Sequence, residues 1–499
     1  MRKKSLFNNT ISSLIFQITT IICGFILPRL ILQNYGSEVN GLVNSISQFL
    51  QIIAFLELGV GAVVQSTLYS PLSQKNWETI SKIIKSANKF FKKLAVVLII
   101  YIFVLCFAYP PSVGKSFDYI YTAALIVCIS ISSFSQYYFG VVDRLLLTAD
   151  QRGYIQYTAQ TITIILNTIA CAVLIEVGAS IQFVKLTTSL IYLGRPIFLR
   201  LYVNRHYKID RRITYDTDPI VQKKNGIAQH IASVVLDHTD TVILSLFSTL
   251  SNVSIYSVYH MVIYGVKQLF TSLTAGVQAV FGELWANKET EKLKKMFDTV
   301  EWIMHTAIVI IFGSTAFLII PFIKIYTLGI ADTNYIQPIF STLITLAHAS
   351  HCLRLPYNIM ILAGGHYKET QKNYIVAALI NIVISVATVY FWGLIGVAIG
   401  TLIAMVYQTI WMAIYDSKTF LNRSIKHFVK QLIIDFAVIL IASIGSSFIS
   451  LHDVNYFSWF VMALLIFMIW ALSSLLINIV FYRTKCVGLL KTIKNKKSN

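Results

Sequence analysis

The chain has few charged residues, and acidic residues are the scarcest of them. Only 13% of its 499 residues are charged, with 22 Asp and Glu against 41 Lys and Arg. Hydrophobic residues make up 56% of the sequence, and the mean hydropathy is +0.68. This composition argues against a soluble domain and is typical of a membrane protein.

The sequence also lacks motifs for catalysis or metal binding. It contains no P-loop, HExxH motif or serine-nucleophile motif, so neither ATP hydrolysis nor an enzyme activity is predicted. None of the six cysteines has the spacing of a zinc site or a disulfide framework, and we expect no metal or other cofactor. Five of them lie in predicted helices, and the sixth lies in the C-terminal tail: Cys23, Cys106, Cys128, Cys171, Cys352 and Cys486.

Basic residues are almost absent from every second gap between apolar segments. Those gaps are short, contain only Lys115, and are Gln33–Glu38, Pro110–Ser116, Gly178–Ile181, Thr249–Asn252, Gly329–Asn334, Phe391–Gly393 and Ser450–Asn455. The other gaps and the two ends hold 34 of the 41 Lys and Arg residues. This alternation is the positive-inside pattern of a multi-pass protein and predicts that both termini are cytoplasmic. It also explains the net charge of +19 through topology and contact with anionic inner-leaflet lipid, rather than through nucleic-acid binding.

Fourteen apolar runs are long enough to cross a bilayer, which requires roughly 20 residues. They lie near 8–32, 40–69, 94–110, 118–143, 154–177, 181–203, 226–248, 253–285, 299–327, 335–363, 373–392, 394–415, 431–449 and 456–482. The sequence therefore predicts an all-α polytopic protein with about 14 transmembrane helices.

An internal repeat divides these crossings. Lys75, Glu78 and Lys82 recur 213 residues later as a second Lys-Glu-Lys set, and the segment ending at Asn167 resembles the one ending at Asn381. Six crossings per half predict two bundles with the same orientation, related by a pseudo-twofold axis along the membrane normal. The expected divisions are an N-terminal bundle, a cytoplasmic linker, a C-terminal bundle, two additional helices and a basic tail, at 1–203, 204–225, 226–417, 418–482 and 483–499.

Two ionisable residues lie at the predicted centre of the membrane, where a charge normally faces a cavity or a partner. Glu57 is in the second crossing and Lys267 in the eighth, and the repeat offset places them one helical turn apart on equivalent helices. We expect them to face one cavity, in which Lys267 holds an anionic group. The alternative is a structural pair that joins the halves, or separate local partners.

Further polar residues share helix faces. Asp237 and Asp240 in the seventh crossing are candidates for coupling to Na⁺ or H⁺, and interhelical hydrogen bonding is the alternative. His351 and Arg354 share a face with His348 in the tenth crossing, and either line a cationic cavity or pack near the cytoplasmic side. Other cavity candidates are His260, which lies two turns from Lys267, and Arg29, which otherwise reaches the interface.

Several stretches resemble the polysaccharide repeat-unit flippases of the multidrug/oligosaccharidyl-lipid/polysaccharide exporter superfamily. They are LPRLILQNYGSEVNGLVNSISQFLQIIAFLELGVGAVVQSTLYSPLS (27–73), DTVILSLFSTLSNVSIYSVYHMV (240–262), VQAVFGELWA (277–286) and NIVISVATVYFWGLIGVAIGTLIA (381–404). The likeness covers most of the first 415 residues, and its motifs are Gly and apolar positions with scattered charges.

The resemblance implies two six-helix bundles that alternate access to the two sides of the membrane. It implies that undecaprenyl diphosphate carrying an oligosaccharide moves to the outer leaflet of the cytoplasmic membrane, for a capsule, exopolysaccharide, O-antigen or similar polymer. Cationic cavity residues would hold the diphosphate, which fits Arg29, Lys267 and Arg354, whereas Glu57, Asp237 and Asp240 depart from a purely cationic cavity. Implied partners are membrane lipids, a polysaccharide polymerase and glycosyltransferases.

Two other functions are compatible with parts of this pattern. A cation-coupled drug or metabolite antiporter of the same superfamily would use Asp237 or Asp240 for coupling. A membrane polymerase or glycosyltransferase would need a large loop with catalytic carboxylates, and the gaps between apolar runs are too short for one.

Overall fold

The structure is a computed structural model that describes residues 2–114, 116–220, 227–451 and 453–496. Within these ranges every regular element is a helix. Side chains are described except at 2–6, 53–59, 62, 227–235, 237, 273, 275, 276, 279, 367 and 486–496. The chain forms two compact units, Met1–Ser254 and Ile255–Asn499. Lys115 and the ends of the predicted linker and tail, 221–225 and 497–499, lie outside the described residues.

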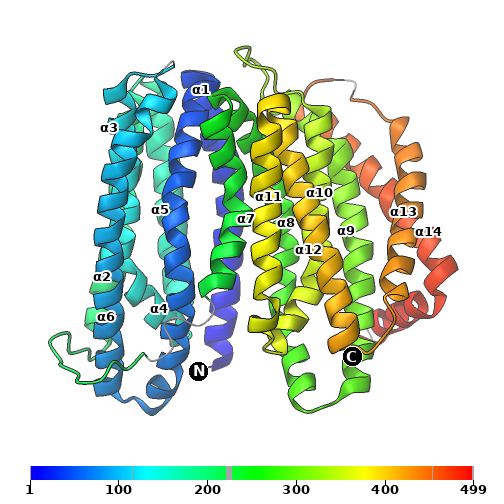
Figure 1. The fold of residues 1–499 in the computed structure, drawn as a ribbon, viewed down its shortest axis with the longest axis horizontal. Helices are drawn as coiled ribbons and strands as arrows, with labels where there is room; N and C mark the ends of the chain where they lie inside the picture. The colour runs from blue at the N-terminus through cyan, green and yellow to red at the C-terminus, as the bar shows by residue number, and fades with distance from the viewer. Residues whose placement is uncertain (1, 115, 221–226, 452, 497–499) are drawn as a thin grey trace. The chain divides into compact units, whose positions relative to one another are not determined.

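The first unit contains seven α-helices among its described residues, shown from blue to green in Figure 1. They are α1 (Arg2–Gln74), α2 (Trp77–Ala108), α3 (Tyr119–Ser135), α4 (Val141–Ala149), α5 (Gly153–Glu176), α6 (Ile181–His206) and α7 (Ile227–Phe247). A 3₁₀-helix, Pro110–Val113, follows α2, and a π-helix, Gln136–Gly140, joins α3 to α4. Gly36 interrupts α1 with φ 84° and ψ 174°, a conformation open to glycine, so α1 contains the first two predicted crossings.

The second unit begins inside α8 (Leu250–Ala286). Its other helices are α9 (Thr290–Tyr326), α10 (Pro338–Ala363), α11 (Tyr367–Trp392), α12 (Leu394–Thr419), α13 (Lys426–Ser447) and α14 (Tyr456–Lys496). The boundary between the two compact units follows Ser254, whereas the predicted second bundle begins at 226. The two boundaries differ because α7 packs against α1 and so belongs to the first unit. The six-helix bundles and their twofold relation stay a prediction.

Unusual turns recur at the spacing of the predicted repeat. Lys75 and Lys288 are 213 residues apart, and both have a positive φ, of 54° and 58°, two residues before a helix begins. Gln151 and Gly365, 214 residues apart, have φ of 58° and 75° and precede α5 and α11 in the same way. Since residues other than glycine seldom adopt a positive φ, this recurrence supports an internal repeat.

Nine helical segments of the described chain are long and apolar enough to cross a membrane. Their apolar side chains stay exposed, as at Phe391 and Val480, which are 81% and 74% exposed. Helices α6 and α10 are not among the nine, because polar and charged residues lower their hydropathy. The chain is a multi-pass membrane protein, and the polar and charged side chains of α6 and α10 require partners inside it.

The segment after α6 docks on the first unit. The backbone N–H of Asp210 donates to the hydroxyl of Ser81 over 3.0 Å, and the hydroxyl of Ser86 donates to Asp218 over 2.6 Å. The hydroxyl of Tyr207 donates to Asp150 over 2.6 Å. Burial, followed by this carboxylate contact, raises the pKa of Tyr207, so the hydroxyl remains a donor. The described part of the predicted linker is thus fixed against α2 and α4.

Helices α13 and α14 pack beside α9, as Figure 1 shows in orange and red. Trp302 of α9 donates its indole N–H to Asn478 over 2.6 Å, and His305 Nδ1 lies 2.5 Å from a carboxylate oxygen of Asp435. Asp435 is therefore a buried partner of His305.

Gly313 allows the closest approach of α9 to α14. A Cβ atom at this position would overlap the ring of Trp470, which is only 2% exposed. We expect Gly313→Ala to destabilise the protein by about 1–3 kcal/mol, as overpacking does elsewhere, and to lower its melting temperature in detergent. Gly24→Ala is the control, because a Cβ there meets nothing within 4 Å. Equal melting temperatures for the two variants would contradict the packing of α14 on α9.

Candidate functional site

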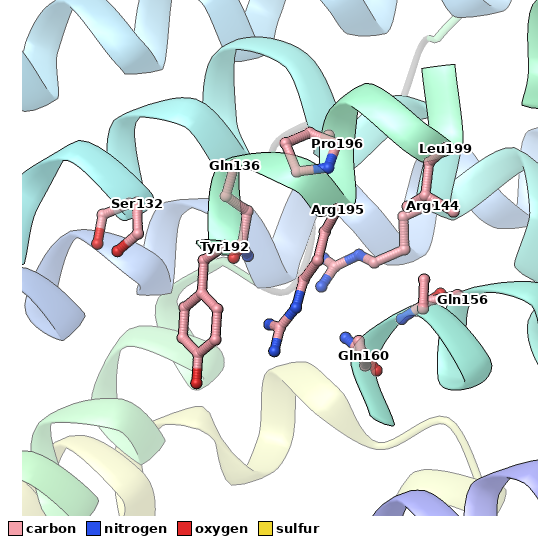
Figure 2. Close-up of a pocket in the computed structure, with 12 residues that line it drawn as sticks. Ser132, Gln136, Arg144, Gln156, Gln160, Tyr192, Arg195, Pro196 and Leu199 are labelled. Atoms are coloured by element: carbon pink, nitrogen blue, oxygen red, sulfur yellow. The ribbon is translucent and has the colours of Figure 1, made fainter. Parts of the chain in front are cut away.

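The first unit contains a polar cavity lined by α1, α3, the π-helix, α4, α5 and α6. It consists of two adjoining pockets of about 190 and 350 Å³, and both are lined by Ser132, Ser133, Gln136 and Tyr192. Figure 2 shows the smaller pocket, where Arg144 and Arg195 extend into one space between Tyr192 and the pair Gln156 and Gln160. A polar space of this kind suits a ligand with many hydroxyl or anionic groups.

Arg195 is held in place but keeps hydrogen-bonding capacity. Its Nε donates to the hydroxyl of Thr163, and its guanidinium carbon lies 4.1 Å from the centre of the Tyr192 ring. Its Nη2 is buried and, among the described residues, has no hydrogen-bond partner. A buried guanidinium nitrogen that lacks an acceptor is unfavourable unless a ligand supplies one.

Two further cations line the same cavity. Arg144 of α4 borders the smaller pocket, and Lys185 of α6 borders the larger one. In the part of the chain that the structure describes, no carboxylate lies within 4 Å of the charged nitrogens of Lys185 or Arg195. Within the part of the chain that the structure describes, the charges of Lys185 and Arg195 are thus not neutralised by ion pairs.

Irregular backbone shapes the wall between these residues. The π-helix places Gln136 and Gly140 against the cavity, and π-helical turns are frequent at functional sites. A Cβ added at Gly140 would lie 3.0 Å from the side chain of Pro196, so the π-helix and α6 approach closely. Pro196 has no N–H, so the carbonyl of Tyr192 loses its helical donor four residues on.

The second unit contains a cationic cluster on α8 and α10. On α8, His260 stacks between two tyrosines, with ring centres 5.5 Å from Tyr256 and 5.4 Å from Tyr264. The Nζ of Lys267, at the end of this face, lies 5.8 Å from the centre of the Tyr264 ring. Lys267 is only 5% exposed, which is rare for a lysine.

The face of α10 that carries His348, His351 and Arg354 lies beside this face of α8 at His260. The rings of His348 and His260 are 5.6 Å apart, and Nη2 of Arg354 lies 2.7 Å from Nδ1 of His351. A guanidinium only donates, so Nδ1 of His351 accepts and this histidine is neutral here. Lys267 and Arg354 both lie close enough to His351 to act on its charge. The structure therefore places His260, Lys267, His351 and Arg354 in one cluster.

The other predicted residues are not assembled by the described structure. Arg29 is half-buried in α1, and Asp240 is 2% exposed in α7. Glu57 and Asp237 lie in α1 and α7, but their side chains are outside the described residues. The pairing of Glu57 with Lys267, and the coupling role of the two aspartates, stay predictions.

Sequence reasoning missed the cavity of the first unit. Arg144, Lys185 and Arg195 are not among the site residues predicted from the sequence. The sequence of α6 contained a usable signal. Lys185, Arg195 and Pro196 lie in one apolar run, and charged residues within such a run indicate a helix that faces a polar space. The serine and glutamine residues that complete the cavity carry no such signal.

Comparison with known proteins places the fold. No family model and no curated protein sequence matches the chain. Among solved structures, it is similar to the lipid II flippase MurJ in an inward closed conformation, with a TM-score of 0.69 and 16% identity over 95% of this chain and 99% of that one. A mutant of the MATE transporter VcmN from Vibrio cholerae gives 0.59 and 12% over 85% and 98%.

An inward-facing multidrug resistance MATE family transporter of the MOP superfamily gives a TM-score of 0.54 and 15% identity over 80% of this chain and 95% of that one. The chain therefore has the fold of flippases and exporters of the multidrug/oligosaccharidyl-lipid/polysaccharide (MOP) superfamily. The identities are too low to transfer a substrate.

Proposed function

We propose that the protein is a flippase that moves an undecaprenyl-diphosphate-linked oligosaccharide from the inner to the outer leaflet of the cytoplasmic membrane. The observation that carries this proposal is the polar cavity of the first unit, which is lined by the half-buried cations Lys185 and Arg195 with no described carboxylate within 4 Å of their charged nitrogens. A diphosphate cannot cross hydrocarbon alone, because burying an unpaired charge is prohibitive. Cations in a polar cavity provide the compensating charge.

Each of the two cation-rich sites contains side chains that suit a part of such a headgroup. Guanidinium groups form charged hydrogen bonds with phosphate oxygens, and Arg195 and Arg354 carry such groups inside the first and second units. Serine, glutamine and tyrosine side chains along the first cavity match sugar hydroxyls, and the stacked rings of Tyr256, His260 and Tyr264 suit the faces of sugar rings. The apolar surface of the helices leaves the prenyl tail in lipid.

We also propose that the chain acts by alternating access of two six-helix bundles, residues 1–203 and 226–417, around a pseudo-twofold axis. In this proposal both termini are cytoplasmic and about 14 helices cross the membrane. The transported unit is polymerised outside the membrane for a cell-surface polysaccharide, which requires glycosyltransferases before the flippase and a polymerase after it.

Binding of the lipid-linked substrate by purified protein tests this function. We expect saturable binding of a polyprenyl-diphosphate oligosaccharide and much weaker binding of the same oligosaccharide without its diphosphate. The contrast follows from the cationic sites, because each charged hydrogen bond contributes about 1.5–3 kcal/mol. Equal affinities for the two ligands would contradict the proposal.

A cation-coupled antiporter is the second candidate, and buried Asp240 is the observation that favours it. An intramembrane carboxylate can bind Na⁺ or a proton and so link export to an ion gradient. The antiporter predicts drug efflux by cells that depends on Asp237 or Asp240. If Asp240→Asn abolishes such efflux while lipid-linked oligosaccharide fails to bind the purified protein, the antiporter is correct.

A further inference from the structure

A second basic groove lies on the outside of the first unit, at the end predicted to be cytoplasmic. It has a volume of about 530 Å³, within the roughly 300–1,000 Å³ of small-molecule sites. One wall is a stripe along α2, and the opposite wall comes from the π-helix, α6 and the segment after it. The lining cations are Lys85, Lys89, Lys92, Lys93, Arg200 and Arg211.

The two arginines of the groove are fixed by one buried carboxylate. Asp143 is fully buried, and its oxygens lie 3.3 Å from Nη1 of Arg200 and 3.1 Å from Nη2 of Arg211. Nη2 of Arg211 also donates to Asn204 over 2.9 Å. The Nη1 of Arg211 is buried and has no partner among the described residues. One donor in the groove is therefore held in position without an acceptor.

The lysines of the groove are not neutralised. In the part of the chain that the structure describes, no carboxylate lies within 4 Å of the amino groups of Lys85, Lys89, Lys92 or Lys93. The amino group of Lys92 lies 5.0 Å from the centre of the ring of Tyr138, which also lines the groove. Asp143 pairs only with the two arginines, so the positive charge of the four lysines can attract an anion.

The groove changes from charged to apolar along its length. At the other end from Lys85 it is lined by Val96 and Phe139, which are 54% and 45% exposed. In a bilayer these side chains contact acyl chains, whereas the lysines lie at the level of the headgroups. An anionic phospholipid of the inner leaflet likewise has a charged headgroup followed by hydrocarbon chains. Each basic residue near that membrane surface contributes about 1 kcal/mol to the attraction.

We propose that this groove binds the phosphate headgroup of an anionic inner-leaflet phospholipid, with Arg211, Lys89 and Lys92 on the phosphate and Val96 and Phe139 beside an acyl chain. The site is separate from the cavity of Arg144, Lys185 and Arg195, and it does not depend on the proposed transport function. A soluble phosphate compound would satisfy the cations but would leave the apolar end unused.

Binding of short-chain lipids to the full-length protein in detergent tests this site. We expect saturable binding of dioctanoyl phosphatidylglycerol, at least tenfold tighter than dioctanoyl phosphatidylcholine, and no competition by millimolar inorganic phosphate. The double variant Lys89→Gln and Lys92→Gln should weaken phosphatidylglycerol binding about tenfold or more. Both lysines are exposed, so folding is preserved.

The matched control is Lys292→Gln with Lys294→Gln, which removes two lysine charges from α9 outside the groove. This control should keep the affinity of the unaltered protein. An unchanged affinity in the groove variant, or equal binding of the zwitterionic lipid, would overturn the proposal. Competition by inorganic phosphate would assign the groove to a soluble anion, and displacement by equimolar polyprenyl diphosphate would assign it to the transported lipid.

Discussion

Replacing Lys267 with alanine is expected to abolish polymer export while the protein still inserts into the membrane at normal levels. Lys267 is buried at 5% exposure beside Tyr264 and within electrostatic reach of His351 and Arg354. An anionic ligand would be attracted by this positive charge, and losing one charged contact of about 1.5–3 kcal/mol would lower its affinity about 10- to 100-fold.

Polymer at the surface of cells that carry only the variant gene measures this effect, with protein level measured in isolated membranes. Lys324→Ala is the matched control, because Lys324 is an exposed lysine in the last turn of α9 in the same unit. The control should export normally. Normal export by Lys267→Ala at normal protein level would remove Lys267 from the site.

The second large effect is expected for Arg195→Ala in the cavity of the first unit. This change removes the buried nitrogen that lacks a partner, together with the contact to Tyr192. We expect the affinity for a polyprenyl-diphosphate oligosaccharide to fall about 10- to 100-fold, because a charged donor to the diphosphate is lost. The variant also loses the hydrogen bond from Nε to Thr163 and the contact to Tyr192, so binding is measured well below the melting temperatures of both proteins.

Arg205→Ala is the matched control for this prediction. Arg205 lies in the last turn of the same helix, but it is exposed and does not line the cavity. Its loss should leave ligand affinity unchanged. If both variants bind the ligand as tightly as the unaltered protein, the cavity of the first unit is not the diphosphate site.

The membrane character of the fold could be predicted from the sequence because it depends on strong, local signals. Long apolar runs predict helices directly, and spacings of three residues are enough to put His348, His351 and Arg354 on one face of a helix. In the structure, His348 of α10 lies beside His260 of α8, and Arg354 donates to His351 on α10 itself. The likeness to MOP-superfamily transporters is likewise confirmed at the level of the fold.

The cavity of the first unit could not be predicted because its walls come from six separate elements. Arg144 lies in the predicted gap between the apolar runs 118–143 and 154–177, where topology is a sufficient explanation for a basic residue. Gln136 and Gly140 line the cavity only because a π-helix turns them toward it, and neither propensity nor hydropathy predicts that bulge. Asp435 gave the same difficulty, since its partner His305 is 130 residues away.

Leaflet transfer in proteoliposomes tests the central claim most directly. A polyprenyl-diphosphate oligosaccharide would be placed in one leaflet, and its arrival in the other would be followed by a probe that cannot cross the membrane. We predict that the unaltered protein accelerates transfer and that Lys267→Ala and Arg195→Ala each lose most of this activity. Transfer at the rate of protein-free vesicles, from protein that is folded and correctly inserted, would contradict the account.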